Sequence, residues 1–178
     1  IYNNNNVKNI VVSGYPFELG NMCNLPDQCG TMLFVQTKYS LRQELENITL
    51  LEEFRQRVDC RIHIKLRPNA SKADKARYSE LLKYPGVRLV DGVECHHGYR
   101  FVLTHCSGMW YEMAFLGVPP IFLSSEENLH VIPCYHDTLH HTNSVEDLIA
   151  IYKKYCDNAR FFEYRCIALR HSQDVLGL

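Results

Sequence analysis

The chain has 178 residues, 46% hydrophobic and 22% charged, and its formal net charge is -1. This length suits one domain with a substantial core. The near-neutral charge, with no long block of either sign, argues against a nucleic-acid binder held by bulk charge. The longest apolar run near a motif, residues 114–123, is too short and too rich in Gly and Pro to cross a membrane.

The first residues are polar and do not form a signal peptide, and the first residue is not Met. We therefore expect a fragment or a processed chain. The sequence has eight cysteines, but a domain of this size needs no disulfide staples, and several cysteines lie in apolar segments. We expect these cysteines to be reduced and the protein to be cytoplasmic. The cysteines in apolar segments are Cys60, Cys106, Cys156 and Cys166.

In the first third of the chain, residues 7–13 read as a strand that ends at Gly14, and residues 31–36 as a buried parallel strand. Residues 41–58 carry apolar side chains at intervals of three and four, which predicts a helix with one apolar face. Residues 60–66 form the next expected strand. The apolar face of the helix comprises Leu41, Leu45, Ile48, Leu51, Phe54 and Val58.

In the middle of the chain, Ser71-Lys-Ala-Asp74 resembles a capping box, which predicts a helix that continues to about residue 84. Residues 87–91 and 101–104 read as strands. Residues 109–116 read as a helix, and the next strand is expected after Pro120.

A second capping signal at Ser144 predicts a helix to about residue 155, and residues 157–170 are expected to form the last helix. Alternating strands and helices predict a Rossmann-like α/β fold with a mainly parallel sheet and helices on both faces. Ligands bind such sheets beyond the carboxyl ends of the strands. We therefore expect a site formed by the loops after Ser13, Gln36, Leu66 and Leu103.

The most informative segment is residues 104–121, where a buried strand leads through a short polar loop into a helix. Free backbone N–H groups at the helix start could bind an anion, aided by Ser107 and by the lack of a side chain at Gly108. Glu112, about one turn into the helix, could accept both hydroxyls of a ribose. The alternative is an ordinary capped helix with Glu112 facing solvent.

Lys65 and Arg67 flank the carboxyl end of the strand at residues 60–66. Strand alternation would place both side chains on one face, where two cations could neutralise a diphosphate. The alternative is a solvated basic strand end.

Four segments resemble a known family when taken in order. Residues 107–121 look like the Ser-Gly…Glu-Ala…Leu-Gly-x-Pro-x-Ile motif in the C-terminal, donor-binding domain of GT-B glycosyltransferases. Residues 32–37 are similar to a strand near the start of that domain. Residues 64–68 (Ile-Lys-Leu-Arg-Pro) and 14–16 (Gly-Tyr-Pro) resemble the Lys-Leu-His-Pro and Gly-Asn-Pro signatures of bacterial capsule, lipopolysaccharide and teichoic-acid transferases.

The resemblance implies that the whole chain, residues 1–178, is one half of a GT-B fold. It implies a nucleotide-sugar donor, a glycan acceptor and an N-terminal acceptor domain that this chain lacks. We expect no cofactor, metal or nucleic acid, and peripheral membrane association of the full-length protein stays open. The donor-binding residues would be Gly14, Lys65, Arg67, His105, Ser107, Gly108 and Glu112.

By the same resemblance, Glu112 binds the ribose, and Ser107 with Gly108 binds the phosphates. The sequence departs from the family at two positions. Arg67 stands where many relatives have His, and Thr104 stands where many retaining enzymes have a second Glu. No catalytic residue is assigned, since the acceptor-side base would come from the other domain.

Other chemistries have weaker signals. No Walker loop and no Gly-x-Gly-x-x-Gly sequence is present, which disfavours an ATP-binding P-loop protein and an NAD-binding protein. Cys106 could be a nucleophile, but no base can be assigned to it. A polyol-phosphate transferase, a nucleotide-sugar epimerase of the same fold or a non-catalytic Rossmann-like binding module remain alternatives. Zinc is a further alternative, but its candidate ligands lack the paired spacing of known motifs; they are Cys95, His96, His97, His105, Cys106, Cys134, His136, His140 and His141.

Overall fold

The computed structural model describes residues 30–37, 40–91, 98–105, 107–123 and 138–176. Their core is a six-stranded sheet in the order β3-β2-β1-β4-β5-β6, and every pair of neighbouring strands is parallel. This confirms the expected Rossmann-like α/β class. The expected strand at residues 7–13 lies outside the described residues. The strands are β1 (Thr31–Val35), β2 (Ile62–Lys65), β3 (Val87–Val90), β4 (Tyr99–Thr104), β5 (Pro120–Leu123) and β6 (His140–Thr142).

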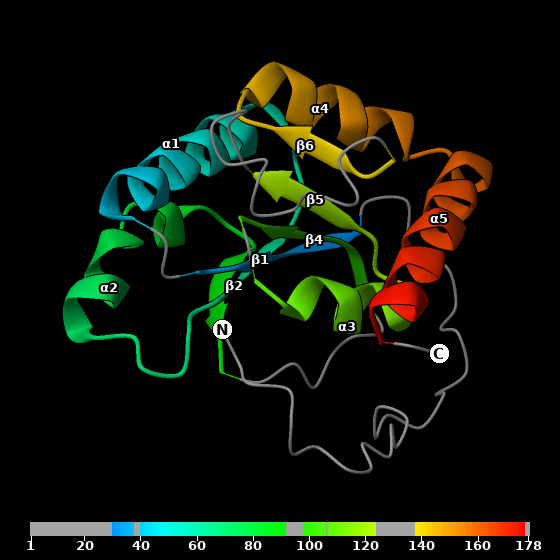
Figure 1. Cartoon of the computed structure of the whole chain (residues 1–178). Coiled ribbons are helices and arrows are strands. Elements are labelled where there is room, and N and C mark those ends of the chain that lie inside the picture. The colour runs from blue at the N-terminus through cyan, green and yellow to red at the C-terminus, as the bar shows by residue number, and fades with distance from the viewer. Residues whose placement is uncertain (1–29, 38–39, 92–97, 106, 124–137, 177–178) are drawn as a thin grey trace, which may run out of the picture.

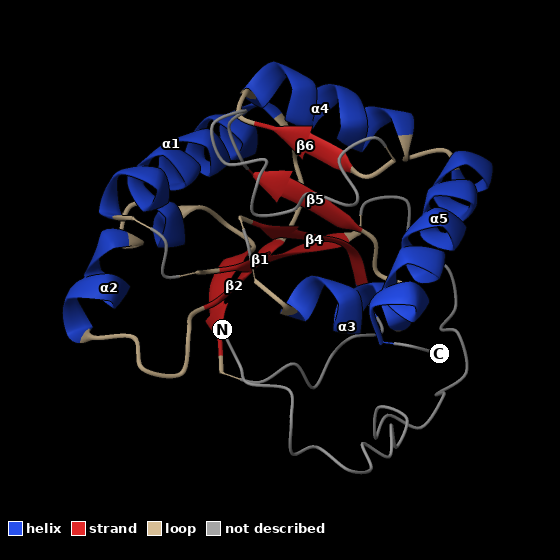
Figure 2. Ribbon diagram, viewed as in Figure 1, coloured by secondary structure: helices blue, strands red, loops and turns tan. Residues whose placement is uncertain are grey.

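Helices cover both faces of the sheet, as Figures 1 and 2 show. The helices α1 (Leu41–Arg57) and α4 (Val145–Lys154) lie on one face and touch through the rings of Phe54 and Tyr152, whose centroids are 5.6 Å apart. The helices α3 (Met109–Phe115) and α5 (Asn158–Leu176) contact each other on the opposite face. This two-sided cover buries the apolar strands on both sides.

Local capping signals place two helix starts correctly. In α2 (Lys72–Arg77), the Ser71 hydroxyl accepts the Asp74 N–H and the Asp74 carboxylate accepts the Ser71 N–H, which completes the capping box. In α4, the Ser144 hydroxyl accepts the Asp147 N–H at 3.1 Å. These caps depend on residues three positions apart, so the sequence alone predicts them.

The helix expected from Ser71 to about residue 84 is shorter than predicted. It ends at Arg77, and a short 3-10 helix, η2 (Leu81–Lys83), follows. Tyr78 at the end of α2 is completely buried, and its ring packs against Phe34 with centroids 6.1 Å apart. Burying this ring turns the chain inward and ends the α-helix.

The end of the chain differs from expectation in two respects. The strand β6 was not predicted, because His140–Thr142 has no apolar run. The last helix extends beyond residue 170 to Leu176. Among the described residues, no helix is long and apolar enough to span a membrane.

Candidate functional site

The strand order reverses between β1 and β4, which are adjacent although β2 and β3 separate them along the chain. In open parallel sheets, such a switch point leaves a crevice at the carboxyl ends of the two strands, where ligands bind. The pairing register puts Lys65, Val35 and Thr104 in one row at this end of the sheet. The loops after β1, β2 and β4 therefore surround the candidate site.

Thr104 joins the two strands at the switch point. Its hydroxyl donates to the Val35 carbonyl at 3.4 Å and accepts the Ser107 N–H at 3.2 Å. Thr104 is fully buried. The residue that stands in place of a family glutamate thus has a structural role, because it fixes the start of the loop after β4.

The loop before α3 already uses several of its own N–H groups. The Ser107 hydroxyl accepts the Met109 N–H at 3.3 Å, and the Ser107 carbonyl accepts the Trp110 N–H at 3.2 Å. Together with the Ser107 N–H, three of the N–H groups expected to be free for an anion have partners within the loop. Anion binding by the Met109 N–H would require the ligand to replace the Ser107 hydroxyl.

Gly108 and Glu112 lie where the sequence places them. Gly108 directly precedes α3, and a Cβ at this position would be 2.9 Å from the Tyr111 hydroxyl. Glu112 is in the first turn of α3 and is half-buried. The loop after β4 therefore brings Ser107, Gly108 and Glu112 together on one short segment.

Lys65 and Arg67 have different environments. β2 ends at Lys65, so the expected strand alternation does not extend to Arg67. The Arg67 guanidinium instead forms an ion pair with Asp74, with 2.9 Å between Nη2 and Oδ2. Lys65 forms no ion pair within the part of the chain that the structure describes. The charge of Arg67 is thus already offset, and that of Lys65 is not offset by a described carboxylate.

Asp74 offsets the charge of Arg67 and is itself strongly stabilised as an anion. Its carboxylate accepts the Ser71 N–H at 2.7 Å and forms ion pairs with Arg67 and Arg77. The hydrogen bond from the Ser71 N–H, followed by those from Arg67 and Arg77, holds the pKa of Asp74 well below its usual range. Asp74 is therefore an anion over the whole physiological pH range.

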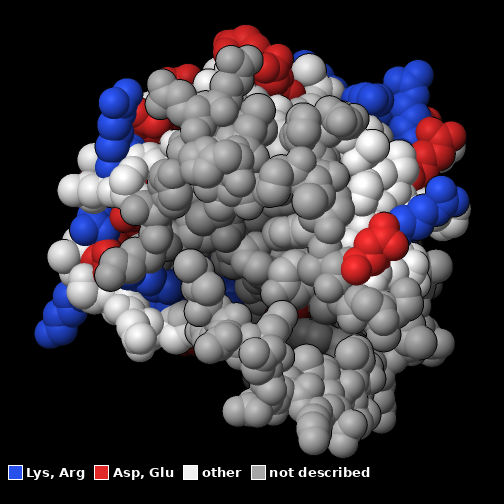
Figure 3. Space-filling model, in the orientation of Figure 1, with Lys and Arg blue, Asp and Glu red and all other residues white. Residues whose placement is uncertain are grey.

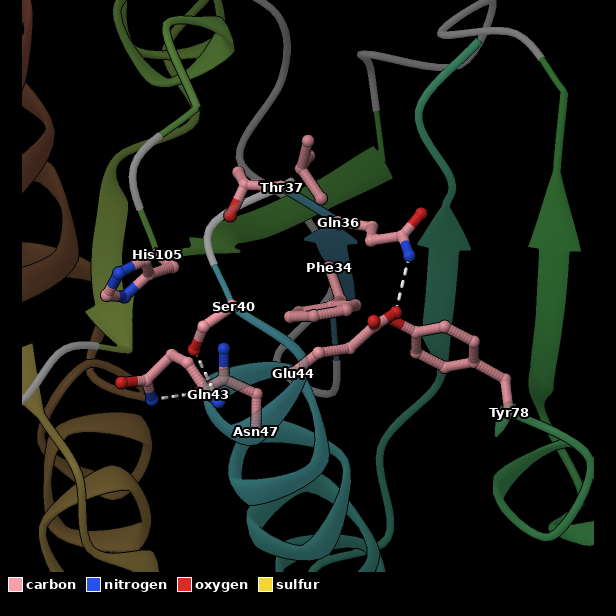
Figure 4. Close-up of a pocket in the computed structure, with 10 residues that line it drawn as sticks. Phe34, Gln36, Thr37, Ser40, Gln43, Glu44, Asn47, Tyr78 and His105 are labelled. Atoms are coloured by element: carbon pink, nitrogen blue, oxygen red, sulfur yellow. Dashed lines mark hydrogen bonds between the residues drawn. The ribbon is translucent and has the colours of Figure 1, made fainter. Parts of the chain in front are cut away.

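His105 is buried, and its ring contacts the end of β5. It is only 2% exposed, and its Nδ1 is 2.9 Å from the Leu123 carbonyl, to which the ring donates in that tautomer. It helps to line a small pocket of about 10 Å³, room for about one water molecule. Figure 4 shows the pocket between His105 and the start of α1, lined by Phe34, Val35, Gln36, Thr37, Ser40, Gln43, Glu44, Asn47, Tyr78 and His105.

The polar lining of this pocket was missed in the sequence. The apolar face predicted for α1 included Leu41 and Leu45, but these are 55% and 47% exposed. Gln43 and Asn47 are buried instead, with the Gln43 amide donating to Asn47 Oδ1 at 3.2 Å. The signal was present, because polar residues at positions 43 and 47 continue the spacing of the buried Leu51 and Phe54.

Zinc binding gains no support from the described histidines. His140 Nε2 is 2.7 Å from the Tyr155 hydroxyl, and burial lowers the pKa of His140 to about 4. His141 stacks on Phe122. No group of three or more potential metal ligands gathers within the described ranges. Gly14 and six candidate ligands lie outside those ranges: Cys95, His96, His97, Cys106, Cys134 and His136.

Two surface features bear on partners. In the view of Figure 3, basic and acidic side chains are interspersed around the periphery. An open groove of about 800 Å³ runs along α1 and the start of α4, and the exposed Leu41 and Leu45 contribute to it. Three cysteines of the described residues are free thiols: Cys60, which is buried, and the half-buried Cys156 and Cys166.

Comparisons with known proteins identify the fold. No protein-family model matches the sequence, and no curated protein matches it. A structure of TarM from S. aureus, solved with fondaparinux, α-GlcNAc-glycerol and UDP, matches 89% of this chain and 35% of its own, at 9% identity and a TM-score of 0.65.

Two further structures extend the likeness. The UDP-GlcNAc 2-epimerase from Neisseria meningitidis, bound to UDP-GlcNAc, matches 76% of this chain and 38% of its own at 15% identity, with a TM-score of 0.55. The glycosyltransferase SnogD from Streptomyces nogalater matches 85% of this chain and 42% of its own at 14% identity, with a TM-score of 0.53.

The chain spans well under half of each of these three structures. At these identities the likeness concerns the fold alone. With its parallel sheet and Rossmann strand order, the described structure is one half of a GT-B-like fold.

Proposed function

We propose that this chain is the donor-binding domain of a glycosyltransferase that moves a sugar from a nucleotide-sugar to a glycan acceptor. The observation that carries the proposal is the reversal of strand order between β1 and β4. It creates a crevice of the kind that binds nucleotides in this class of sheet. Structures of similar fold were solved with UDP or UDP-GlcNAc, which makes a uridine nucleotide the first ligand to test.

In this proposal each residue around the crevice contacts a different part of the nucleotide. Lys65 supplies a cation for the diphosphate, Ser107 and Gly108 contact a phosphate, and Glu112 accepts the ribose hydroxyls. These groups would also stabilise the negative charge that develops on the leaving nucleotide.

The other predicted donor-binding residues have more indirect roles. Arg67 belongs to the wall of the crevice, with its charge offset by Asp74. His105 supports the loop after β4 through the Leu123 carbonyl. A role for Gly14 stays a prediction from the sequence.

The proposal includes a second domain that binds the acceptor and provides the base. Chemistry in the cleft between two domains needs both walls, because proximity supplies much of the rate. The chain alone is then a folded domain that binds nucleotide weakly and transfers no sugar. The exposed Leu41 and Leu45 are the kind of apolar surface that an adjoining domain would cover.

Calorimetric titration of the chain with UDP, GDP, CDP and CMP tests the binding function. Binding of at least one nucleotide is expected, and failure of all of them would favour a non-catalytic module. Product analysis after joining the chain to its upstream sequence tests the transfer. Robust sugar transfer by the chain alone would refute the two-domain proposal.

A nucleotide-sugar epimerase is the second candidate, because the match to the N. meningitidis UDP-GlcNAc 2-epimerase covers 76% of this chain. The two functions differ in their products. Incubation of the two-domain protein with UDP-GlcNAc alone would yield an epimerised nucleotide-sugar in one case, whereas a transferase would require an acceptor.

A further inference from the structure

A half-buried carboxylate, that of Glu44, lies beside the candidate site and is not among the predicted binding residues. The Glu44 side chain in α1 is 10% exposed. Its Oε1 accepts a hydrogen bond from the Gln36 side-chain amide and another, at 3.0 Å, from the Tyr78 hydroxyl. Its Oε2 is 3.0 Å from Nη1 of Arg77. One carboxylate thus joins the loop after β1 to α2, as the close-up in Figure 4 shows for Gln36 and Tyr78.

Gln36 continues the pairing of β1 with β2 beyond the ends of both strands. Its backbone N–H donates to the Lys65 carbonyl at 2.9 Å. Its side-chain Oε1 accepts the Arg67 N–H at 3.3 Å. In a regular parallel ladder, a main-chain carbonyl would accept that N–H. The Gln36 side chain takes its place and therefore holds the segment from Lys65 to Arg67 at both ends.

The orientation of this amide depends on Glu44. A Gln side chain has one acceptor end and one donor end. Since the donor end is bound to Glu44, the oxygen is directed to the Arg67 N–H. The Arg67 guanidinium is held from the other side by Asp74, which itself pairs with Arg77.

These contacts form a closed ring beside the segment that carries Lys65. Ion pairs link Glu44 to Arg77, Arg77 to Asp74, and Asp74 to Arg67. Gln36 closes the ring, because its side chain bonds both Glu44 and the Arg67 N–H while its backbone N–H bonds the Lys65 carbonyl. Water cannot easily take over these hydrogen bonds, because Gln36 and Asp74 are buried. Leaving a buried amide or carboxylate without its partner is costly.

We propose that Glu44 and Gln36 are positioning residues that hold Lys65 against the phosphates of the nucleotide. This inference rests on the proposed function. It adds that the wall formed by the loops after β1 and β2 is built before the ligand binds, and that its effect concerns the phosphates rather than the nucleoside.

The test compares Glu44→Gln with Glu46→Gln by calorimetry, with UDP and uridine as separate ligands. Glu46 is a matched control on the same helix, since it is exposed and pairs only with Arg42 among described residues. In Glu44→Gln, one acceptor oxygen becomes a donor that faces Arg77. We expect the Kd for UDP to rise about tenfold, as for a lost hydrogen bond to a charged group, and the Kd for uridine to stay unchanged.

A double-mutant cycle with Lys65→Met separates positioning from a general loss of structure. If Glu44 acts through Lys65, Glu44→Gln will weaken UDP binding in the native background and have little effect in Lys65→Met. Equal losses in both backgrounds, or equal losses for UDP and uridine, would overturn the inference. If Glu44→Gln does not fold, Gln36→Ala takes its place in the test, because it leaves the ion pair of Glu44 and Arg77 intact. Gln36→Ala should show the same loss of affinity for UDP and none for uridine.

Amide hydrogen exchange tests the positioning of the segment separately from nucleotide binding. The Arg67 N–H should exchange faster in Glu44→Gln and in Gln36→Ala than in the native chain, whereas Glu46→Gln should leave it unchanged. If the native chain binds neither UDP nor uridine, the proposed uridine nucleotide is wrong, and the exchange result decides only whether Glu44 and Gln36 fix the segment. An unchanged Arg67 exchange rate would then overturn the inference about Glu44.

Discussion

The guanidinium of Arg165 lies directly over Gly117, in the space that any side chain at this position would enter. A Cβ on Gly117 would collide with Nη2, Nε and Cζ of Arg165, and Gly117 also has a φ of 85°. Arg165 is 5% exposed, so its guanidinium cannot move easily into water. The turn from α3 to β5 therefore requires glycine for two separate reasons.

Gly117→Ala should consequently destabilise the domain by about 3 kcal/mol, combining the cost of a left-handed backbone with that of overpacking. Gly86→Ala is the matched control, because Gly86 has a φ of 81° but its Cβ would meet the flexible Arg61 side chain at 3.1 Å. It should cost about 1 kcal/mol, the backbone term alone. Urea denaturation measures both. Equal losses would mean that Arg165 moves aside without penalty.

Arg100 is a second buried cation whose removal should be costly. It is fully buried, its Nε donates to the Tyr155 carbonyl at the end of α4 at 2.9 Å, and its Cζ lies 4.5 Å from the Phe161 ring centroid. Arg100→Met should lower the free energy of unfolding by about 3 kcal/mol, since the carbonyl loses its donor inside the protein. The exposed Arg160, changed to Met, should alter it by less than about 0.5 kcal/mol.

The lowered pKa of Asp74 predicts that the folded protein loses stability in acid. Its pKa is lowered in the folded protein by Ser71, Arg67 and Arg77, so its contribution is present above the unfolded pKa of about 3.9 and is lost as the pH falls below it. Asp74→Asn should be less stable than the native chain at pH 7, and the two should converge in acid. Denaturation curves across this range test the prediction. Glu80→Gln, at an exposed pair with Lys83, should show no comparable convergence.

Glu112→Ala tests the ribose contact. If Glu112 accepts ribose hydroxyls, UDP binding should weaken by about 1–3 kcal/mol, the range for hydrogen bonds to a charged group. Calorimetry on the folded variant measures the change. The exposed Glu163 on α5, changed to Ala, should bind UDP as the native chain does. An unaltered affinity in Glu112→Ala would remove Glu112 from the site.

Nucleotide binding should survive treatment with a chelator. Lys65 can offset phosphate charge directly, and the sequence has no Asp-x-Asp pair to hold a divalent ion. UDP titrations with and without EDTA should give the same Kd. Loss of binding in EDTA while the circular dichroism spectrum stays unchanged would show that a metal completes the site.

Several features of the fold could be predicted from the sequence because they depend on neighbours along the chain. Apolar runs identified β1 and β4, and the residues three positions apart in Ser71-Lys-Ala-Asp74 identified the start of α2. The small polar loop before Met109 likewise identified where α3 begins. Strand and helix periodicities are local, and short capping motifs act within one turn.

The candidate site could be predicted only in part. The sequence placed Ser107, Gly108 and Glu112 on one loop and helix start, and the structure agrees. It did not predict that Met109 and Trp110 would already donate to Ser107. Those bonds depend on the backbone path of the loop, which residue types alone do not define.

The tertiary structure alone decided which parts of the chain meet at the crevice. Glu44 reaches Tyr78 across 34 residues of sequence, and Thr104 reaches Val35 across 69. The same long-range packing exposed Leu41 and buried Gln43, against the simple apolar pattern of α1. The class of fold follows from the order of apolar and amphipathic segments, because strand and helix periodicities are local. Which side chains meet at the crevice depends on the order of the strands in the sheet, and that order results from burying all faces of the sheet at once.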